Sequence, residues 1–164
     1  MEQSSYEDTR PHAYEDETVE WIAEDKFGTV LARAVHEDKL DRDDFCRKFA
    51  DSEVAKAFEN GNPDYICFMS DTELLDMVLG RKPRDSGGMY PFFNNETFMG
   101  SVYVFVQWRL NLPFKALFEA CPPSELVKYR FSKYWGIYAE EFLDVFRKYL
   151  PEEDFDGIAD TEAD

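Results

Sequence analysis

The chain has 164 residues, of which 44% are hydrophobic and 16% aromatic, too many core-forming side chains for a protein that is disordered throughout. Its formal net charge of −17 predicts repulsion from nucleic acid and anionic membranes, and attraction to a basic protein partner. No apolar run approaches the roughly 18 residues of a membrane-spanning helix, and the polar N-terminus lacks a secretory signal pattern. The three cysteines, odd in number and widely spaced, favour free thiols and a cytoplasmic location over a disulfide framework.

Charge and aromatic residues are unevenly distributed along the chain. Residues 1–80 carry a net charge of −13, residues 81–150 a net charge of +3, and residues 151–164 a net charge of −7. The aromatic residues show the opposite trend, because 17 of the 27 lie between 81 and 150. We therefore expect a flexible N-terminus (1–14), an acidic helical half (15–80), a linker loop (81–95), an aromatic-rich helical half (96–150) and a disordered acidic tail (151–164).

The acidic half begins with a strong helix signal. From Thr18 to Val35, apolar residues recur at intervals of three and four, the spacing of one helical stripe. Asp41 then stands where its side chain can cap a shorter helix that carries Phe45 and Phe49. We expect both helices to place these apolar residues in the core.

Further caps divide the rest of the acidic half. Ser52 can cap a third helix, and Ser70 or Asp71 can cap the helix TELLDMVL. Gly80 is placed to end that helix, because glycine readily adopts the left-handed conformation of a helix C-terminus. The intervening residues 63–68 favour a further turn or a short strand.

The linker and the first helix of the aromatic half come next. Residues 81–95 contain two prolines and two glycines, which predicts a loop. Residues 96–112 include the β-rich run SVYVFVQW, yet they continue without a break and their apolar spacing also fits a buried helix, which we prefer. Pro113 suits the first turn of another helix, which Pro122 ends.

Two helices are expected to complete the aromatic half. Ser124 can cap SELVKYRFSKYW, which Gly136 would close. The segment IYAEEFLDVFRKYL is amphipathic and has Lys148 in its last turn. The predicted fold is therefore all-α, a compact bundle of about seven helices.

A weak internal repeat offers one interpretation of this architecture. When the chain is aligned with itself at an offset of 72 residues, Gly28 meets Gly100, and SEVAKAF (52–58) meets SELVKYRF (124–131). The order of helices and caps also agrees in the two halves. Two explanations stay open: a duplication that gave two similar helical halves, or ordinary helix-start signals used twice.

Each half has a common outline: a long first helix from Val19 or Thr97, a short helix with phenylalanine or leucine, a Ser-Glu start, and a closing acidic–apolar helix such as EEFLDVFRKYL. This outline resembles small acidic helical proteins encoded beside ADP-ribosyltransferase-like toxins, in bacterial toxin–antitoxin or phage-defence neighbourhoods. The mid-chain histidine pair of such modules is not evident in this sequence. The resemblance implies a mobile-element or toxin–antitoxin setting.

Motifs for catalysis and for metal binding are weak. His36 is followed by several acids, but a transition-metal site needs several histidines or cysteines at fixed geometry. The tail segment 152–163 matches only the first half of a calcium loop, since Ala163 stands where a bidentate glutamate is needed. Carboxylates are so numerous that no catalytic pair stands out. We therefore expect no metal, no cofactor and no enzyme activity.

The acidic half is the preferred candidate for function. Carboxylates on short rigid helices can occupy a basic groove that would otherwise bind phosphates, so we expect a protein that blocks a basic, nucleic-acid-binding partner, as an antitoxin or an anti-CRISPR or antirestriction inhibitor does. The expected partner-binding residues are Glu37, Asp38, Asp41, Asp43, Asp44, Asp51, Glu53 and Glu59.

Two alternatives remain at this stage. The acids can serve solubility alone, with the basic residues of the linker, Arg81, Lys82 and Arg84, paired to them within the chain. Alternatively, the protein is a structural adaptor or oligomerisation module that binds through exposed aromatics of the linker such as Tyr90 and Phe92, together with Phe93.

Overall fold

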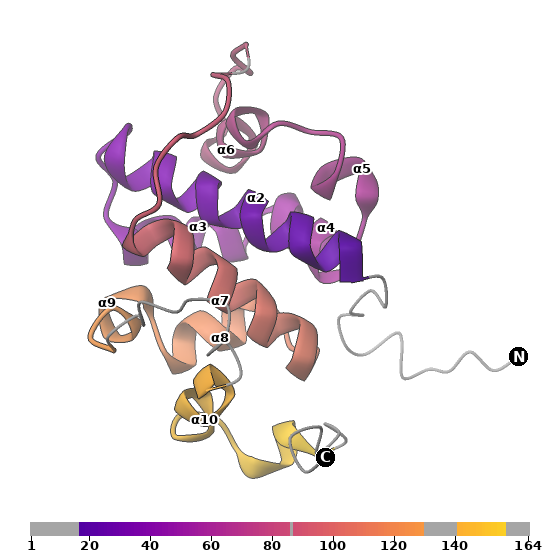
Figure 1. Cartoon of the computed structure of the whole chain (residues 1–164), viewed down its shortest axis with the longest axis vertical. Helices are drawn as coiled ribbons and strands as arrows, with labels where there is room; N and C mark the ends of the chain where they lie inside the picture. Colours follow the sequence, from indigo (N-terminus) through magenta and orange to yellow (C-terminus); the bar gives the residue numbers. More distant parts are fainter. Residues whose placement is uncertain (1–16, 86, 130–140, 157–164) are drawn as a thin grey trace, which may run out of the picture.

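The computed structural model describes residues 17–85, 87–129 and 141–156 (Figure 1). Within these ranges the chain forms nine α-helices and one 3-10 helix without any β-strand, which confirms the all-α prediction. The elements are α2 (Glu17–His36), α3 (Arg42–Ala50), α4 (Glu53–Glu59), α5 (Pro63–Ile66), α6 (Asp71–Leu79), α7 (Asn95–Leu110), α8 (Phe114–Ala120), α9 (Pro123–Leu126), α10 (Glu141–Arg147) and the 3-10 helix η1 (Glu152–Phe155).

The two longest helices, α2 and α7, cross at the centre of the molecule (Figure 1). They touch through backbone at Gly28 and Gly100. A methyl group added at Gly100 would lie 2.5 Å from the Cα atom of Gly28, and one added at Gly28 would overlap the carbonyl oxygen of Thr97. Only glycine permits so close an approach, because it has no Cβ atom. This crossing therefore depends on a residue type that isolated helices disfavour.

Aromatic rings from four helices pack beside the crossing. The ring of Phe27 in α2 stacks on Phe49 of α3 with centroids 4.4 Å apart, and Phe114 of α8 meets Phe49 edge-on at 5.2 Å. Phe118 of α8 packs edge-on against Tyr103 of α7 at 4.7 Å. The cluster joins residues of the acidic half to residues of the aromatic half. The two halves therefore share one core.

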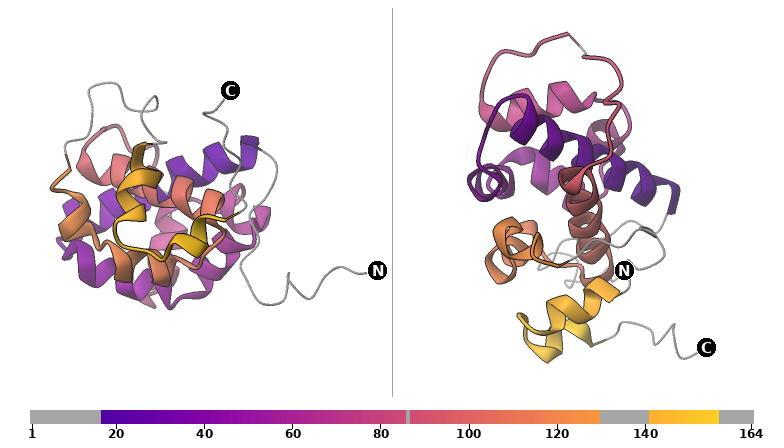
Figure 2. Two further views of the ribbon diagram at one scale, coloured as in Figure 1. Left: turned by 90° about the horizontal axis from the view of Figure 1, so that it is seen from below. Right: turned by 60° about the vertical axis from the view of Figure 1, so that its left-hand side comes forward.

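The outer helices lie on opposite sides of the crossing. Helix α6 packs against α2, and α10 packs against α7, so the order across the molecule is α6, α2, α7, α10 (Figures 1 and 2). The glycines that the repeat alignment pairs, Gly28 and Gly100, are also the glycines that meet. This arrangement fits two similar helical halves packed face to face. A duplication remains a hypothesis.

Most of the predicted helix ends in the acidic half are confirmed. Asp41 and Ser52 are N-caps whose side chains accept hydrogen bonds from backbone N–H groups. Ser70 and Glu73 form a reciprocal capping box at the start of α6, and Gly80 ends this helix at φ 69°. Residues 63–66 form the single-turn helix α5, so the short-strand alternative there is wrong. Asn62 caps that turn and Pro63 starts it.

The aromatic half follows the prediction less closely. Residues 95–110 form helix α7, as preferred, and the linker before it has no regular structure in its described residues. Pro113 is the N-cap of α8 rather than a residue of its first turn. Ser124 is not an N-cap, because Pro122 is the N-cap of α9 and Pro123 its first residue, so the proline pair, with φ fixed, starts the helix two residues earlier than predicted. The similar phrases at 52–58 and 124–131 are therefore not equivalent helix starts.

The acidic tail is partly ordered. Residues 152–155 form η1, whose Phe155 is buried beneath Arg147, with the guanidinium 4.4 Å from the ring centroid. Disorder was therefore a wrong prediction for the beginning of the tail, because Phe155 gains burial and a cation–π contact. The predictions of a flexible N-terminus, of a helix closed at Gly136 and of disorder at the end of the tail concern residues outside the described ranges.

Replacing Gly100 with alanine tests the crossing. Alanine raises helix propensity by about 1 kcal/mol relative to glycine, so an uncrowded helix would become more stable. We expect instead that Gly100→Ala lowers the free energy of unfolding by about 2 kcal/mol, because its methyl group forces α2 and α7 apart. Urea unfolding measures this difference, with Ser101→Ala on the same helix as control. A stabilised Gly100→Ala protein would contradict the close crossing.

Candidate partner-binding surface

The first two predicted acids lie at the C-terminal end of α2 and are engaged within the protein. The Glu37 carboxylate accepts a hydrogen bond from Arg33, one turn earlier, at 3.0 Å. The Asp38 carboxylate pairs with Arg81 of the linker at 2.7 Å. Asp38 therefore helps to connect the end of α2 with the linker, whereas Glu37 pairs within its own segment and its side chain is 46% exposed.

The next three acids belong to α3 and its cap. Asp41 accepts the Asp44 backbone N–H at 3.0 Å. Asp43 accepts two hydrogen bonds from Ser124, from its backbone N–H at 2.8 Å and from its hydroxyl at 2.6 Å. Asp44 forms an exposed ion pair with Arg47, a kind of pair that contributes little to stability. Asp41 and Asp44 are both exposed, but the Asp41 carboxylate is engaged as the cap of α3, so Asp44 is the one available to a partner.

The last three predicted acids have contrasting environments. Asp51 and Glu53 are exposed beside the start of α4, and Glu53 accepts the Tyr65 hydroxyl at 3.2 Å. Glu59 is buried and accepts the backbone N–H of Phe114 at 2.8 Å. Burial raises the pKa of Glu59, although this hydrogen bond acts in the other direction. Glu59 connects the two halves and is not a surface residue.

The eight acids therefore do not form one continuous negative surface. Asp44, Asp51 and Glu53 remain as an exposed edge along α3 and α4, which we call the α3–α4 edge. The same two helices also expose three basic residues: Arg47, Lys48 and Lys56. The mixture of signs differs from the uniform charge of a phosphate backbone.

Arg33 is the main link between α2, α6 and the linker. Its side chain is 5% exposed, it donates from Nε to Asp71 of α6 at 2.9 Å, and it donates from Nη2 to the carbonyl oxygen of Gly88 at 2.7 Å. Its guanidinium also lies 5.3 Å from the ring centroid of Tyr90. Burial acts against the charge, but hydrogen bonds and attraction from Asp71 and Glu37 raise the pKa of Arg33. The linker is thereby fixed to the helices.

A second buried charge fixes the start of the linker. The Asp76 side chain is fully buried in α6 and accepts hydrogen bonds from Arg81 Nε at 2.7 Å, from the Arg84 backbone N–H at 2.9 Å and from Arg84 Nε at 3.0 Å. Burial alone would raise the pKa of Asp76, yet the two arginines lower it. These contacts confirm that Arg81 and Arg84 pair with acids of the same chain.

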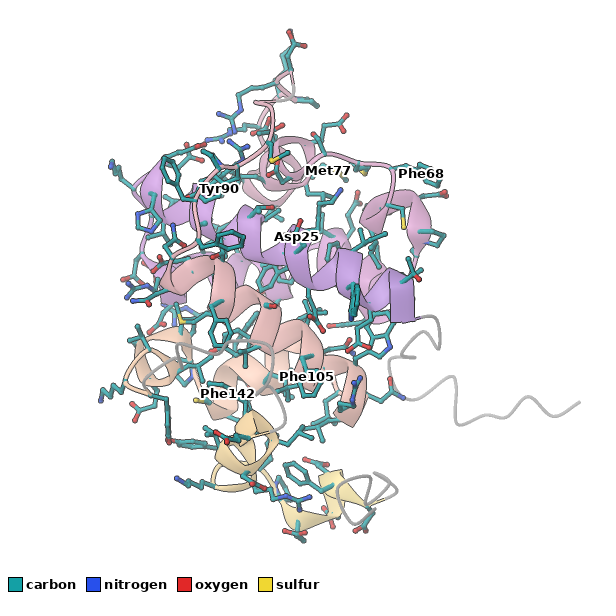
Figure 3. All side chains as sticks on the ribbon, viewed as in Figure 1. Asp25, Phe68, Met77, Tyr90, Phe105 and Phe142 are labelled. Carbon is teal, nitrogen blue, oxygen red and sulfur yellow. The ribbon has the colours of Figure 1, made fainter. Side chains whose placement is uncertain are left out.

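The fixed linker presents apolar side chains to solvent. Met89 is 89% exposed, Phe92 is 62% exposed and Phe93 is 80% exposed. Tyr90 is buried, which corrects its prediction as an exposed aromatic (Figure 3). It is held because Asn94 donates to its hydroxyl at 3.0 Å and Phe92 packs edge-on against its ring at 5.5 Å. We call Met89, Phe92 and Phe93 the apolar loop.

Two buried carboxylate clusters near the ends of the α2–α7 pair were not predicted. At one end, Glu96 accepts hydrogen bonds from Arg42 and from His36 Nε2, the latter at 2.6 Å. Burial would raise the pKa of Glu96, but these two partners lower it. His36 is therefore bonded to a carboxylate of α7.

At the other end, Glu20 accepts a hydrogen bond from Arg109 of α7 at 2.9 Å. The pKa of Glu24 is raised to about 8, mainly by burial and also by the neighbouring Glu20 charge. Glu24 and Glu96 are equivalent in the repeat alignment, yet their pKa values shift in opposite directions. Each of these glutamates lies four residues before a glycine of the crossing, Glu24 before Gly28 and Glu96 before Gly100. This spacing is the sequence signal for their position, but it can be recognised only once the crossing is known.

Among the described residues, no group of three or more histidine, cysteine, aspartate and glutamate residues is placed to hold a metal ion. No helix in the described ranges combines the length and apolar character needed to cross a membrane. The chain matches no protein family, no curated protein and no solved structure.

The Glu24 carboxyl should make stability depend on pH. Its ordinary pKa is 4.5 and its pKa in the folded protein is about 8, so the folded state holds a proton that the unfolded state releases between these values. Stability from this group is fully present below pH 4.5 and is lost as the pH rises toward 8. We expect Glu24→Gln to match wild type near pH 5 and to exceed its stability at about pH 9.

Urea unfolding across this pH range measures the effect, with Asp25→Asn, an exposed neighbour on α2, as the matched control. Parallel stability curves for wild type and Glu24→Gln from pH 5 to 9 would show that Glu24 does not hold this proton.

The Asp76 contacts predict a loop that loosens when the charge is removed. Asp76→Asn keeps the size of the side chain but weakens the bonds to both arginines, and we expect a loss of about 1–3 kcal/mol in the free energy of unfolding. Because the folded pKa lies below the ordinary value of 3.8, this loss should persist at every pH above 3.8 and shrink only below it. Chymotrypsin should also cleave at Phe92 and Phe93 faster than in wild type.

Asp85→Asn is the control for this variant, because Asp85 is an exposed acid of the same linker. Equal cleavage rates for the two variants would contradict the role of Asp76 in fixing the loop.

Proposed function

We propose that this chain is a non-catalytic acidic binding protein that blocks a basic, nucleic-acid-binding protein partner, as an antitoxin or an anti-CRISPR or antirestriction inhibitor does. The observation that carries the proposal is the net charge of −17, most of it in the half that holds α2 to α6. Such a charge accelerates encounter with a basic protein and disfavours nucleic acid itself.

The α3–α4 edge supports this function with exposed carboxylates on rigid elements. Asp44, Asp51 and Glu53 lie on or beside two helices whose N-termini are capped by Asp41 and Ser52. Capped helices hold these charges at fixed separations, which lowers the entropy lost on binding. The interspersed bases favour recognition of a specific pattern on the partner over imitation of a regular duplex.

The proposal includes a cytoplasmic location. Cys46, Cys67 and Cys121 are free thiols, and the first and last are buried. Free buried thiols are typical of proteins from reducing compartments. A bacterial defence or toxin–antitoxin setting would agree with this location.

A second candidate function is a structural adaptor that binds through apolar contacts. The observation that favours it is the apolar loop, whose three large side chains are mostly exposed. An adaptor held by such contacts should tolerate salt, whereas an acidic blocker should not. The two functions thus differ in a measurable property.

Charge reversal tests the proposed function. The protein is used to isolate a partner from its native host, the partner is purified, and the dissociation constant is measured from about 50 to 500 mM salt. We expect the triple variant Asp44→Lys, Asp51→Lys and Glu53→Lys to weaken binding by about 10- to 100-fold at the lowest salt, because it removes attraction and adds repulsion.

The control is a triple variant with the same change in net charge, Glu119→Lys, Asp144→Lys and Asp156→Lys, at exposed acids of the aromatic half and the tail. Equal weakening by both triple variants would show that total charge, not the α3–α4 edge, determines binding. An affinity that does not change with salt would refute the acidic-blocker function and favour the adaptor.

A further inference from the structure

The apolar loop is held in a fixed position by buried charges. Arg33 bonds the carbonyl oxygen of Gly88 and lies over the ring of Tyr90, while Phe92 rests edge-on against that ring. Asp76 fixes the other end of the same linker through Arg84. A loop that served only to connect α6 with α7 would not need two buried charges. The anchors keep exposed apolar side chains in place without burying them.

The net charge of the whole chain favours a cationic partner, although the linker itself carries Arg81, Lys82 and Arg84. The cations of Arg81 and Arg84 are paired with Asp76, so they repel an approaching base less than free cations would. Glu37 lies beside the loop, because it shares the Arg33 guanidinium with Gly88, and its side chain is 46% exposed. The protein as a whole is strongly negative. A second copy of the chain would carry the same negative charge, which opposes self-association.

We propose that Met89 and Phe92, at the head of the apolar loop, are the anchor that docks on a cationic amphipathic segment of a protein partner, with Glu37 at the rim. This inference rests on the proposed function and adds its apolar contact. The negative charge of the chain attracts the basic face of the segment, and the loop binds its apolar face. Because the loop is fixed before binding, little conformational entropy is lost when it docks.

Two fluorescein-labelled peptides of about 18 residues serve as probes. Both carry the same lysines; one has leucine at i, i+3, i+4 and i+7 positions, and the other has serine there. Fluorescence anisotropy gives their dissociation constants for the full chain. We expect the leucine peptide to bind wild type at least about tenfold more tightly than the serine peptide, because it alone buries the loop side chains.

The loop variant is Met89→Ser with Phe92→Ser, and its control is Trp21→Ser with Phe68→Ser. Trp21 and Phe68 are 73% and 80% exposed but lie outside the linker, so the control removes similar apolar area elsewhere. We expect the preference for the leucine peptide to disappear in the loop variant and to persist in the control. Thermal unfolding of both variants checks that they remain folded.

Three results would overturn the inference: no preference in wild type, a preference that survives in the loop variant, or an equal loss in the control. Sedimentation of the protein alone can give a fourth contrary result. If wild type is a dimer and the loop variant a monomer, the apolar loop binds a second copy of the chain and not a cationic segment. A different result would refute the proposed function: dissociation constants of both peptides that change neither with salt nor in the Asp44→Lys, Asp51→Lys and Glu53→Lys variant. Salt-dependent binding without a leucine preference refutes only the loop anchor.

Discussion

The backbone contact between Gly28 and Gly100 is the constraint on which the rest of the fold depends. It brings α2 and α7 closer than side chains would permit. The aromatic core then packs beside this crossing, with Phe27 and Tyr103 contributed by the two crossing helices. Helices from both halves contribute to this core, so the two halves share it. The burial of apolar rings offsets the poor helix propensity of the two glycines.

Buried charges connect the elements around this crossing. Glu96 joins α7 to α2 and α3 through His36 and Arg42, and Arg33 joins α2 to α6 and the linker. A buried charge is tolerated only with good partners, so each of these residues requires its neighbours to keep one arrangement. The same requirement places the apolar loop on the surface. Stability and the position of the apolar loop thus depend on the same anchoring residue, Arg33.

The sequence predicted the fold better than the site. The charged residues of the acidic half were all visible, but Asp43 and Glu59 bond to Ser124 and Phe114, which lie far along the chain. Nothing local distinguishes such an acid from Asp51, which stays exposed. Tyr90 and Phe92 look equivalent in the sequence, yet the first is buried because Arg33 and Asn94 contact it. Which acids and aromatics face a partner is a result of long-range pairing.

The sequence by itself determined the features that depend on neighbouring residues: the helical class, the caps at Asp41, Ser52 and Ser70, and the termination at Gly80. These follow from apolar spacing and from side chains that bond the backbone three residues away. Only the tertiary structure decided that Gly28 meets Gly100, and that Glu24 and Glu96 have opposite pKa shifts. The physical reason is that close packing and the energy of a buried charge depend on residues brought together from distant parts of the chain.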